Sequence, residues 1–317
     1  MEEILTNAKY QLDNEGYTYI DLIESNYISE SKFKSAQKRC LKYWYKYFTD
    51  KGLPEDSIKI NINSKMKNNQ YFKQPKDSLM FKALYGHHKR NGDFYINTRK
   101  PAVSQHDGMG LATSQPAIYK DKKLIKMKEK LRPIFNHMYG SNTHLHLSRF
   151  GLKLPFKGSK DMITHTDMSY IKEFKNNYPK RRDINDPISY APFSENQEPQ
   201  RIQALLCLSD SDSGWYGYKK SHLKYRELGD KLNWPGKTTS LQLIPKKVLK
   251  DLNLERVDVK SKFGRLIMWN CGIAHGNSAC KDTIPRLVLY INYQPNNENT
   301  SADKIVGLGN QPVEINI

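Results

Sequence analysis

A succession of short β-prone segments in the second half of the chain restricts the possible folds more than any other feature. These segments cover residues 145–152, 202–208, 257–259, 266–269 and 287–293, and clusters of Gly, Pro, Asn and Asp separate them. Many short strands divided by turn residues are typical of a β-sandwich or a β-barrel. We therefore expect a β core between residues 141 and 300.

The first 140 residues have a different character, mainly helical and irregular. An amphipathic helix is predicted where apolar residues recur at helical spacing, at Phe33, Ala36, Cys40, Trp44 and Tyr47. A second helix is predicted from Asp121 to Tyr139, with Gly140 as its stop signal. Its apolar face includes Met127 or Lys128. We expect its basic flank, to which Lys128 also belongs, to be solvated rather than in contact with phosphates. Gly16 to Ile20 should form a short strand.

Together these segments predict an α+β chain of one domain, residues 1–317, in which N-terminal and flanking helices accompany the β core. The polar stretch 172–201 interrupts the strands. A segment of that length without an obvious element is usually a functional loop, so we expect it to be lid-like. Residues 301–317 are expected to form a tail.

The net charge of +18 has three possible explanations. Lysine and arginine can neutralise the phosphates of a nucleic acid, or they can attract an anionic substrate. They can also be ordinary solvated residues, because they are spread along the whole chain. No apolar run approaches the ~20 residues that a membrane span needs. The start lacks a signal peptide, and the four cysteines are scattered, so a reducing, cytoplasmic location is expected.

A possible metal site begins at His165-Thr166-Asp167. On a strand, residues i and i+2 point to the same face, so His165 and Asp167 can present an imidazole and a carboxylate to one point. His275 could supply a third ligand. Two histidines and one carboxylate on one face of an ion are the ligand set of non-haem iron(II) oxygenases. The pair alone is weak in a chain with nine histidines, and a zinc hydrolase fits the same ligand types.

Arg286 follows His275 by eleven positions and opens an apolar run, residues 287–291. Pro285 indicates a turn before this run, so Arg286 could reach the same cavity from a neighbouring strand. A guanidinium binds a carboxylate through two parallel hydrogen bonds, as a dicarboxylate co-substrate requires. The alternative is a surface arginine paired with a nearby acid. The zinc hydrolase gives Arg286 no role.

This set of motifs resembles the phytanoyl-CoA dioxygenase family. The matching elements are His165-Thr166-Asp167, the segment 203–210 followed by Gly214, Lys220-Ser221-His222, and His275 with Arg286. The resemblance is strongest from about 139 to 294. The chain departs from the family at Lys220, where the motif has Gly-Ser-His, and at Gly264-Arg265, where it has Gly-Asp.

The resemblance implies a double-stranded β-helix, the jelly roll of cupin-like proteins, with helices outside one sheet. It implies iron(II) held by His165, Asp167 and His275. A carboxylate at Asp167 favours hydroxylation over halogenation, because halogenating relatives have a small residue there.

The resemblance also implies that Arg286 binds 2-oxoglutarate, with Gln203 and Asn277 as weaker candidates for the same pocket. With O2, such an enzyme would hydroxylate a C–H bond of a small molecule, which could be anionic, and release succinate and CO2. Two alternatives stay open. One is the same chemistry on nucleic acid or another anionic macromolecule; the other is a catalytically silent β-sandwich binding protein.

Overall fold

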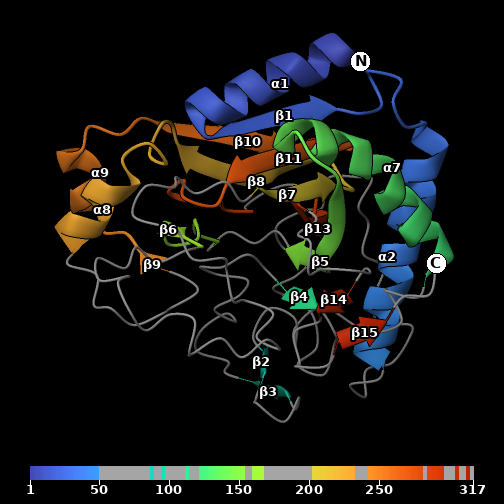
Figure 1. Ribbon diagram of the computed structural model, residues 1–317. Coiled ribbons are helices and arrows are strands. Elements are labelled where there is room, and N and C mark those ends of the chain that lie inside the picture. Colours follow the sequence, from blue (N-terminus) through green and yellow to red (C-terminus); the bar gives the residue numbers. More distant parts are fainter. Residues whose placement is uncertain are drawn as a thin grey trace.

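The computed structural model describes residues 1–49, 86–88, 94–96, 111–113, 121–153, 159–167, 202–232, 242–280, 284–295, 304–306 and 312–314. Helices and antiparallel sheets are both present, as the α+β prediction requires (Figure 1). The predicted loop 172–201 lies outside the described residues. No helix in the described ranges is both long enough and apolar enough to cross a membrane.

The larger sheet has six strands, and every neighbouring pair in it is antiparallel. In spatial order the strands are β1 (Tyr17–Asp21), β11 (Arg265–Asn270), β7 (Ile202–Cys207), β13 (Arg286–Pro295), β5 (Thr143–Lys153) and β4 (Leu111–Thr113). Five of these strands coincide with segments that the sequence predicts. The other, β4, is not predicted.

The smaller sheet has five strands, also antiparallel. In order they are β10 (Arg256–Ser261), β8 (Ser211–Tyr218), β12 (His275–Asn277), β6 (His165–Thr166) and β9 (Gln242–Leu243). Two further pairs stand apart: β2 (Gly86–His88) with β3 (Phe94–Ile96), and β14 (Lys304–Val306) with β15 (Pro312–Glu314). The expected tail, residues 301–317, thus contains a strand pair.

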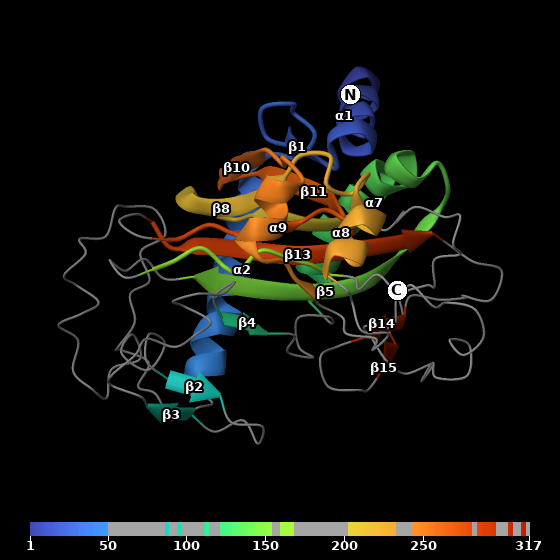
Figure 2. The ribbon, with the colours of Figure 1, turned by 90° about the vertical axis from the view of Figure 1, so that its left-hand side faces the viewer.

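The helices lie on two sides of the sheets (Figures 1 and 2). They are α1 (Glu2–Glu15), α2 (Glu30–Thr49), α7 (Lys122–Tyr139), α8 (Tyr225–Leu232) and α9 (Lys246–Asp251). The first three share one apolar core with the larger sheet, whereas α8 and α9 pack together in a second cluster. Helix α1 precedes the first predicted strand and was not expected, because only Ala8 and Leu12 of it are buried.

Strand β13 shows how the larger sheet separates two cores. Leu287, Leu289 and Ile291 belong to the core under the helices, whereas Val288 and Tyr290 pack with residues of the smaller sheet. This alternation follows from the period of two along a strand. The face of β13 that turns away from the helices therefore borders the space between the two sheets.

Helix α7 begins and ends at its predicted residues. The Asp121 carboxylate accepts hydrogen bonds from the backbone N–H groups of Lys123 and Leu124, at 2.9 and 3.2 Å. Gly140 ends the helix with a φ of 66°, in the left-handed region that favours glycine. Of the two alternatives for the apolar face, Met127 or Lys128, both are buried, and the Lys128 side chain is fully buried. Only the placement of Lys128 on the solvated flank was wrong.

Candidate metal centre and its pocket

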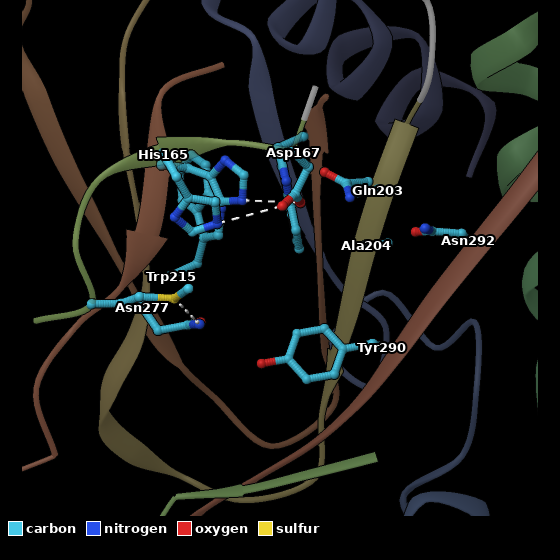
Figure 3. Close-up of a pocket in the computed structure, with 11 residues that line it drawn as sticks. His165, Asp167, Gln203, Ala204, Trp215, Asn277, Tyr290 and Asn292 are labelled. Carbon is cyan, nitrogen blue, oxygen red and sulfur yellow. Dashed lines mark hydrogen bonds and ion pairs between the residues drawn. The ribbon is translucent and has the colours of Figure 1, made fainter. Parts of the chain in front are cut away.

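Strand pairing in the smaller sheet brings together two histidines that are 110 positions apart in the sequence. His165 on β6 and His275 on β12 are directly opposite in the register, and their ring centroids are 4.6 Å apart. Asp167 follows β6 and turns its carboxylate toward both rings (Figure 3). The structure therefore places the three sequence-predicted ligands around one point.

The three side chains present their ligand atoms toward each other. Nε2 of His165 lies 3.4 Å from one Asp167 oxygen, and Nε2 of His275 lies 3.5 Å from the other. Each Nδ1 lies within hydrogen-bond distance of a backbone carbonyl, Ile163 at 2.9 Å and Ile273 at 3.0 Å. Because a carbonyl only accepts, Nδ1 carries a proton in both rings, and Nε2 is the atom of each ring that faces the carboxylate.

The electrostatics of the centre favour an ionised carboxylate. Burial acts to raise the pKa of Asp167, but hydrogen bonds and charge from His165 and His275 outweigh it and hold this pKa well below its usual range. Burial acts to lower the pKa of His165, and the Asp167 carboxylate reverses the effect, so this pKa is raised. The centre thus combines an anionic oxygen donor with nitrogen donors that attract positive charge.

The geometry fits a divalent cation. The three ligand atoms all lie within 4.8 Å of one another. Metal–nitrogen and metal–oxygen bonds of roughly 2.1 Å at right angles would separate neighbouring ligands by roughly 3 Å, close to the observed spacing. Two imidazoles and one carboxylate suit a transition metal such as iron(II) or zinc(II) better than calcium or magnesium.

The centre opens into a pocket between the two sheets (Figure 3). Besides the three candidate ligands, its lining consists of Met162, Gln203, Ala204, Trp215, Trp269, Asn277, Tyr290 and Asn292. Trp269 lies in the core between the sheets and also borders this pocket. Its ring centroid is 5.3 Å from that of His275.

Arg286 is buried beside the pocket, with 1% of its surface exposed. Its guanidinium donates hydrogen bonds to the side-chain oxygen of Asn277 at 2.6 Å, to the Gly214 carbonyl at 3.0 Å and to the Tyr290 hydroxyl at 3.3 Å. Asn277 and Tyr290 line the pocket, so the guanidinium lies directly behind its wall. The alternative of a surface strand arginine is wrong.

The other predicted site residues have different surroundings. Gln203 lies on the pocket wall formed by β7, and none of the hydrogen bonds to Arg286 given above involves it. His222, part of the Lys220-Ser221-His222 motif, is buried and donates from Nε2 to the Asp13 carbonyl at 3.0 Å. Lys220 has a φ of 60°, in the left-handed region that favours glycine.

Five pocket residues were not predicted from the sequence: Met162, Ala204, Trp215, Tyr290 and Asn292. A signal existed for two of them, because Tyr290 and Asn292 are four and six positions from Arg286 along one strand and must share its face. Trp215 lies in β8, which is not among the predicted strands. Its ring stacks on Tyr17 with centroids 5.2 Å apart.

Comparisons with solved structures identify proteins with a similar fold. The chain matches the non-haem α-ketoglutarate-dependent carbocyclase SnoK from nogalamycin biosynthesis with a TM-score of 0.52, 11% sequence identity, and coverage of 98% of this chain and 93% of SnoK. It matches the epimerase SnoN, in complex with Fe3+, α-ketoglutarate and nogalamycin RO, with a TM-score of 0.51, 11% identity, and coverage of 99% and 96%. The chain shares their fold. No protein-family model and no curated protein matches the sequence.

Proposed function

We propose that this protein is an iron(II)- and 2-oxoglutarate-dependent oxygenase that hydroxylates a C–H bond of a small organic substrate. The observation that carries the proposal is the convergence of His165, Asp167 and His275, whose ligand atoms lie within 4.8 Å of one another at the wall of a pocket. Three ligands on one side of an octahedral ion leave the side toward the pocket open to small molecules.

The residues of the chain would hold and orient the metal. The backbone carbonyls of Ile163 and Ile273 fix each imidazole with Nε2 toward the ion. The ionised Asp167 would complete the set and offset part of the metal charge. When bound, iron(II) would supply the activation of O2, coupled to the conversion of 2-oxoglutarate to succinate and CO2.

The proposed role of Arg286 is to bind the distal carboxylate of 2-oxoglutarate. Its hydrogen bonds to Asn277 and Tyr290 would hold the guanidinium in one orientation, and a planar fork in a fixed position suits bidentate carboxylate binding. Asn277 would thus act on the co-substrate through Arg286. The indoles of Trp215 and Trp269 would exclude water from the metal.

The two facing sheets, the helices outside the larger one and the fold of SnoK and SnoN support the double-stranded β-helix as the finer description of this architecture. We also propose membership of the phytanoyl-CoA dioxygenase family, supported by the motif set. Four buried free cysteines suit a cytoplasmic location.

A small-molecule substrate is favoured over nucleic acid by the character of the pocket. No lysine or arginine is among the described residues that line it, although the chain carries a net charge of +18. Phosphate recognition would need basic side chains along the binding surface. Turnover that falls steeply with added salt would favour a nucleic-acid substrate instead.

Anaerobic titration with iron(II) and then 2-oxoglutarate tests the proposal. We expect a weak visible absorption band that needs both additions and is absent from His275→Ala. The matched control is His137→Ala, which removes a histidine from α7 and should keep the band. A wild-type protein that binds neither addition would be a silent scaffold. One that binds zinc but not 2-oxoglutarate would point to the zinc hydrolase.

A further inference from the structure

The pocket has two chemically different ends, and both can be located along β13. Arg286, Val288, Tyr290 and Asn292 lie on the same face of this strand. Arg286 and Asn292 are six positions apart on the extended chain, a distance of roughly 20 Å at 3.3 Å per residue. The guanidinium lies at one end and an amide at the other, with the Tyr290 ring between them.

The amide end is a row of three polar side chains on adjacent strands. Trp269 on β11 pairs with Gln203 on β7. Ile291 on β13 pairs with Ala204, so the same register continued by one residue sets Asn292 opposite Gln203. All three line the pocket, and Figure 3 shows Gln203 and Asn292 on the side of Asp167 away from the two imidazoles.

Two polar atoms in this row have no hydrogen-bond partner among the described residues. Gln203 is 7% exposed, and its Oε1 is buried without a hydrogen-bond partner. Nε1 of Trp269, which is 4% exposed, is likewise buried without one. A buried polar group without a partner is costly, and native proteins leave few of them. One acceptor and one donor side by side on a pocket wall indicate a ligand that offers the complementary pair.

The row also selects the charge of its ligand. Among the described lining residues the only ionised side chain is Asp167, whose charge a bound cation would offset. A carboxylate can only accept, so it would leave Gln203 Oε1 without a donor. A primary amide such as Gln203 matches an edge that carries one N–H donor and one carbonyl acceptor. Such an edge is uncharged, and the cis-amide of a lactam presents it.

We infer that the row of Trp269, Gln203 and Asn292 binds the substrate through an uncharged cis-amide edge of the lactam type. This inference rests on the proposed function and moves Gln203 from the co-substrate, for which the sequence suggested it, to the substrate. The aromatic walls at Trp215 and Tyr290 would cover the apolar part of the same molecule.

Ligand-observed saturation-transfer NMR tests the inference on the full chain loaded with zinc(II) and 2-oxoglutarate, so that no turnover occurs. The probe is 2-piperidone. N-methyl-2-piperidone removes the donor, while pentanoate and piperidinium supply the two charges. We expect 2-piperidone to bind about tenfold more tightly than each of the others, the size of one lost hydrogen bond in a closed site.

Gln203→Leu should weaken 2-piperidone binding about tenfold and leave N-methyl-2-piperidone unchanged. Gln242→Leu makes the same chemical change on β9, at a half-buried residue that does not line the pocket, and should change neither. Asn292→Leu is a second variant, expected to reduce the same preference. Equal binding of the lactam pair, tighter binding of either charged probe, or an unchanged preference in both pocket variants would overturn the inference.

The anaerobic visible band separates this inference from the proposed function. A band in the wild type together with no lactam preference would overturn the substrate class alone. No band in the wild type would overturn the proposed oxygenase function. The lactam preference is measured by NMR without iron, so that measurement decides the inference whether or not the band appears.

Discussion

Lys128 offers a quantitative test of how the helical layer is stabilised. The side chain is fully buried on the face of α7 that packs in the core under the larger sheet, near Cys40 of α2. Burial lowers the pKa of its ammonium from 10.5 to about 8, and the nearby Cys40, Asp121 and Glu129 oppose this only in part. At pH 7 the folded protein therefore keeps a positive charge in an apolar layer.

The magnitude follows from the two pKa values. At ~1.4 kcal/mol per pKa unit, the fall from 10.5 to about 8 lowers the free energy of unfolding by about 3 kcal/mol when the lysine is charged. Lys128→Met keeps the length and apolar character of the stem and removes the charge. We expect it to raise the free energy of unfolding by about 3 kcal/mol at pH 7.

The effect must depend on pH with a definite sign. Between pH 8 and 10.5 the unfolded chain binds the proton and the folded chain does not, so the stability of the wild type rises with pH over this window. Above it the lysine is neutral in both states. The advantage of Lys128→Met should therefore be full below pH 8 and small near pH 10.5.

Urea unfolding followed by tryptophan fluorescence at pH 7 and pH 10.5 measures both quantities. Lys126→Met is the matched control, because Lys126 lies in the same helix and is exposed; it should change stability by less than ~0.5 kcal/mol. A Lys128→Met protein that is less stable than the wild type at pH 7, or an advantage that does not shrink at high pH, would refute the reasoning.

Three further outcomes are expected. Asp167→Ala should abolish coupled turnover, and undiminished succinate and hydroxylated product by mass spectrometry would refute the ligand assignment. Arg286→Lys should raise the KM for 2-oxoglutarate more than tenfold, because one ammonium cannot replace a bidentate fork; a KM within twofold of the wild type would contradict the role. Burial would raise the pKa of Asp121, but hydrogen bonds from the Leu124 backbone and the Tyr43 hydroxyl lower it, so Asp121→Asn should reduce the free energy of unfolding by about 1 kcal/mol at pH 7. That difference should fade as pH drops from the usual Asp value of 3.8 through the lower folded pKa, and urea unfolding at pH 7 and pH 3 would show whether it does.

The candidate metal centre could be predicted because its chemistry is local in sequence. A His-x-Asp pair on a strand fixes the relative direction of two ligands through the period of two, whatever the rest of the fold does. To predict His275 as the third ligand, it was enough to expect a second strand that ends near the first. The structure adds the β6–β12 register that sets His165 opposite His275, which no spacing in the sequence encodes.

Errors arose where tertiary packing outweighs local composition. Lysine is usually solvated, so Lys128 was also assigned to the solvated flank, yet its helical position falls between Met127 and Leu131 on the buried face. Strand β8 contains Asp212 and Gly214, residues typical of turns, and was not among the predicted strands. Pairing with both β10 and β12 keeps it extended.

To predict which residues form the two ends of the pocket requires knowledge of such non-local pairing. The sequence of β13 alone, however, indicates part of the answer. Leu287, Leu289 and Ile291 form one face of this strand and are fully buried. Arg286 and Asn292 belong to the other face and are also buried, 1% and 5% exposed. A strand buried on both faces is ordinarily apolar on both, because a buried polar side chain needs a partner. A strand that is strictly apolar on one face and carries arginine, tyrosine and asparagine on the other therefore indicates a cavity on its polar side. For β13, that reading of the sequence locates the pocket without knowledge of the metal ligands.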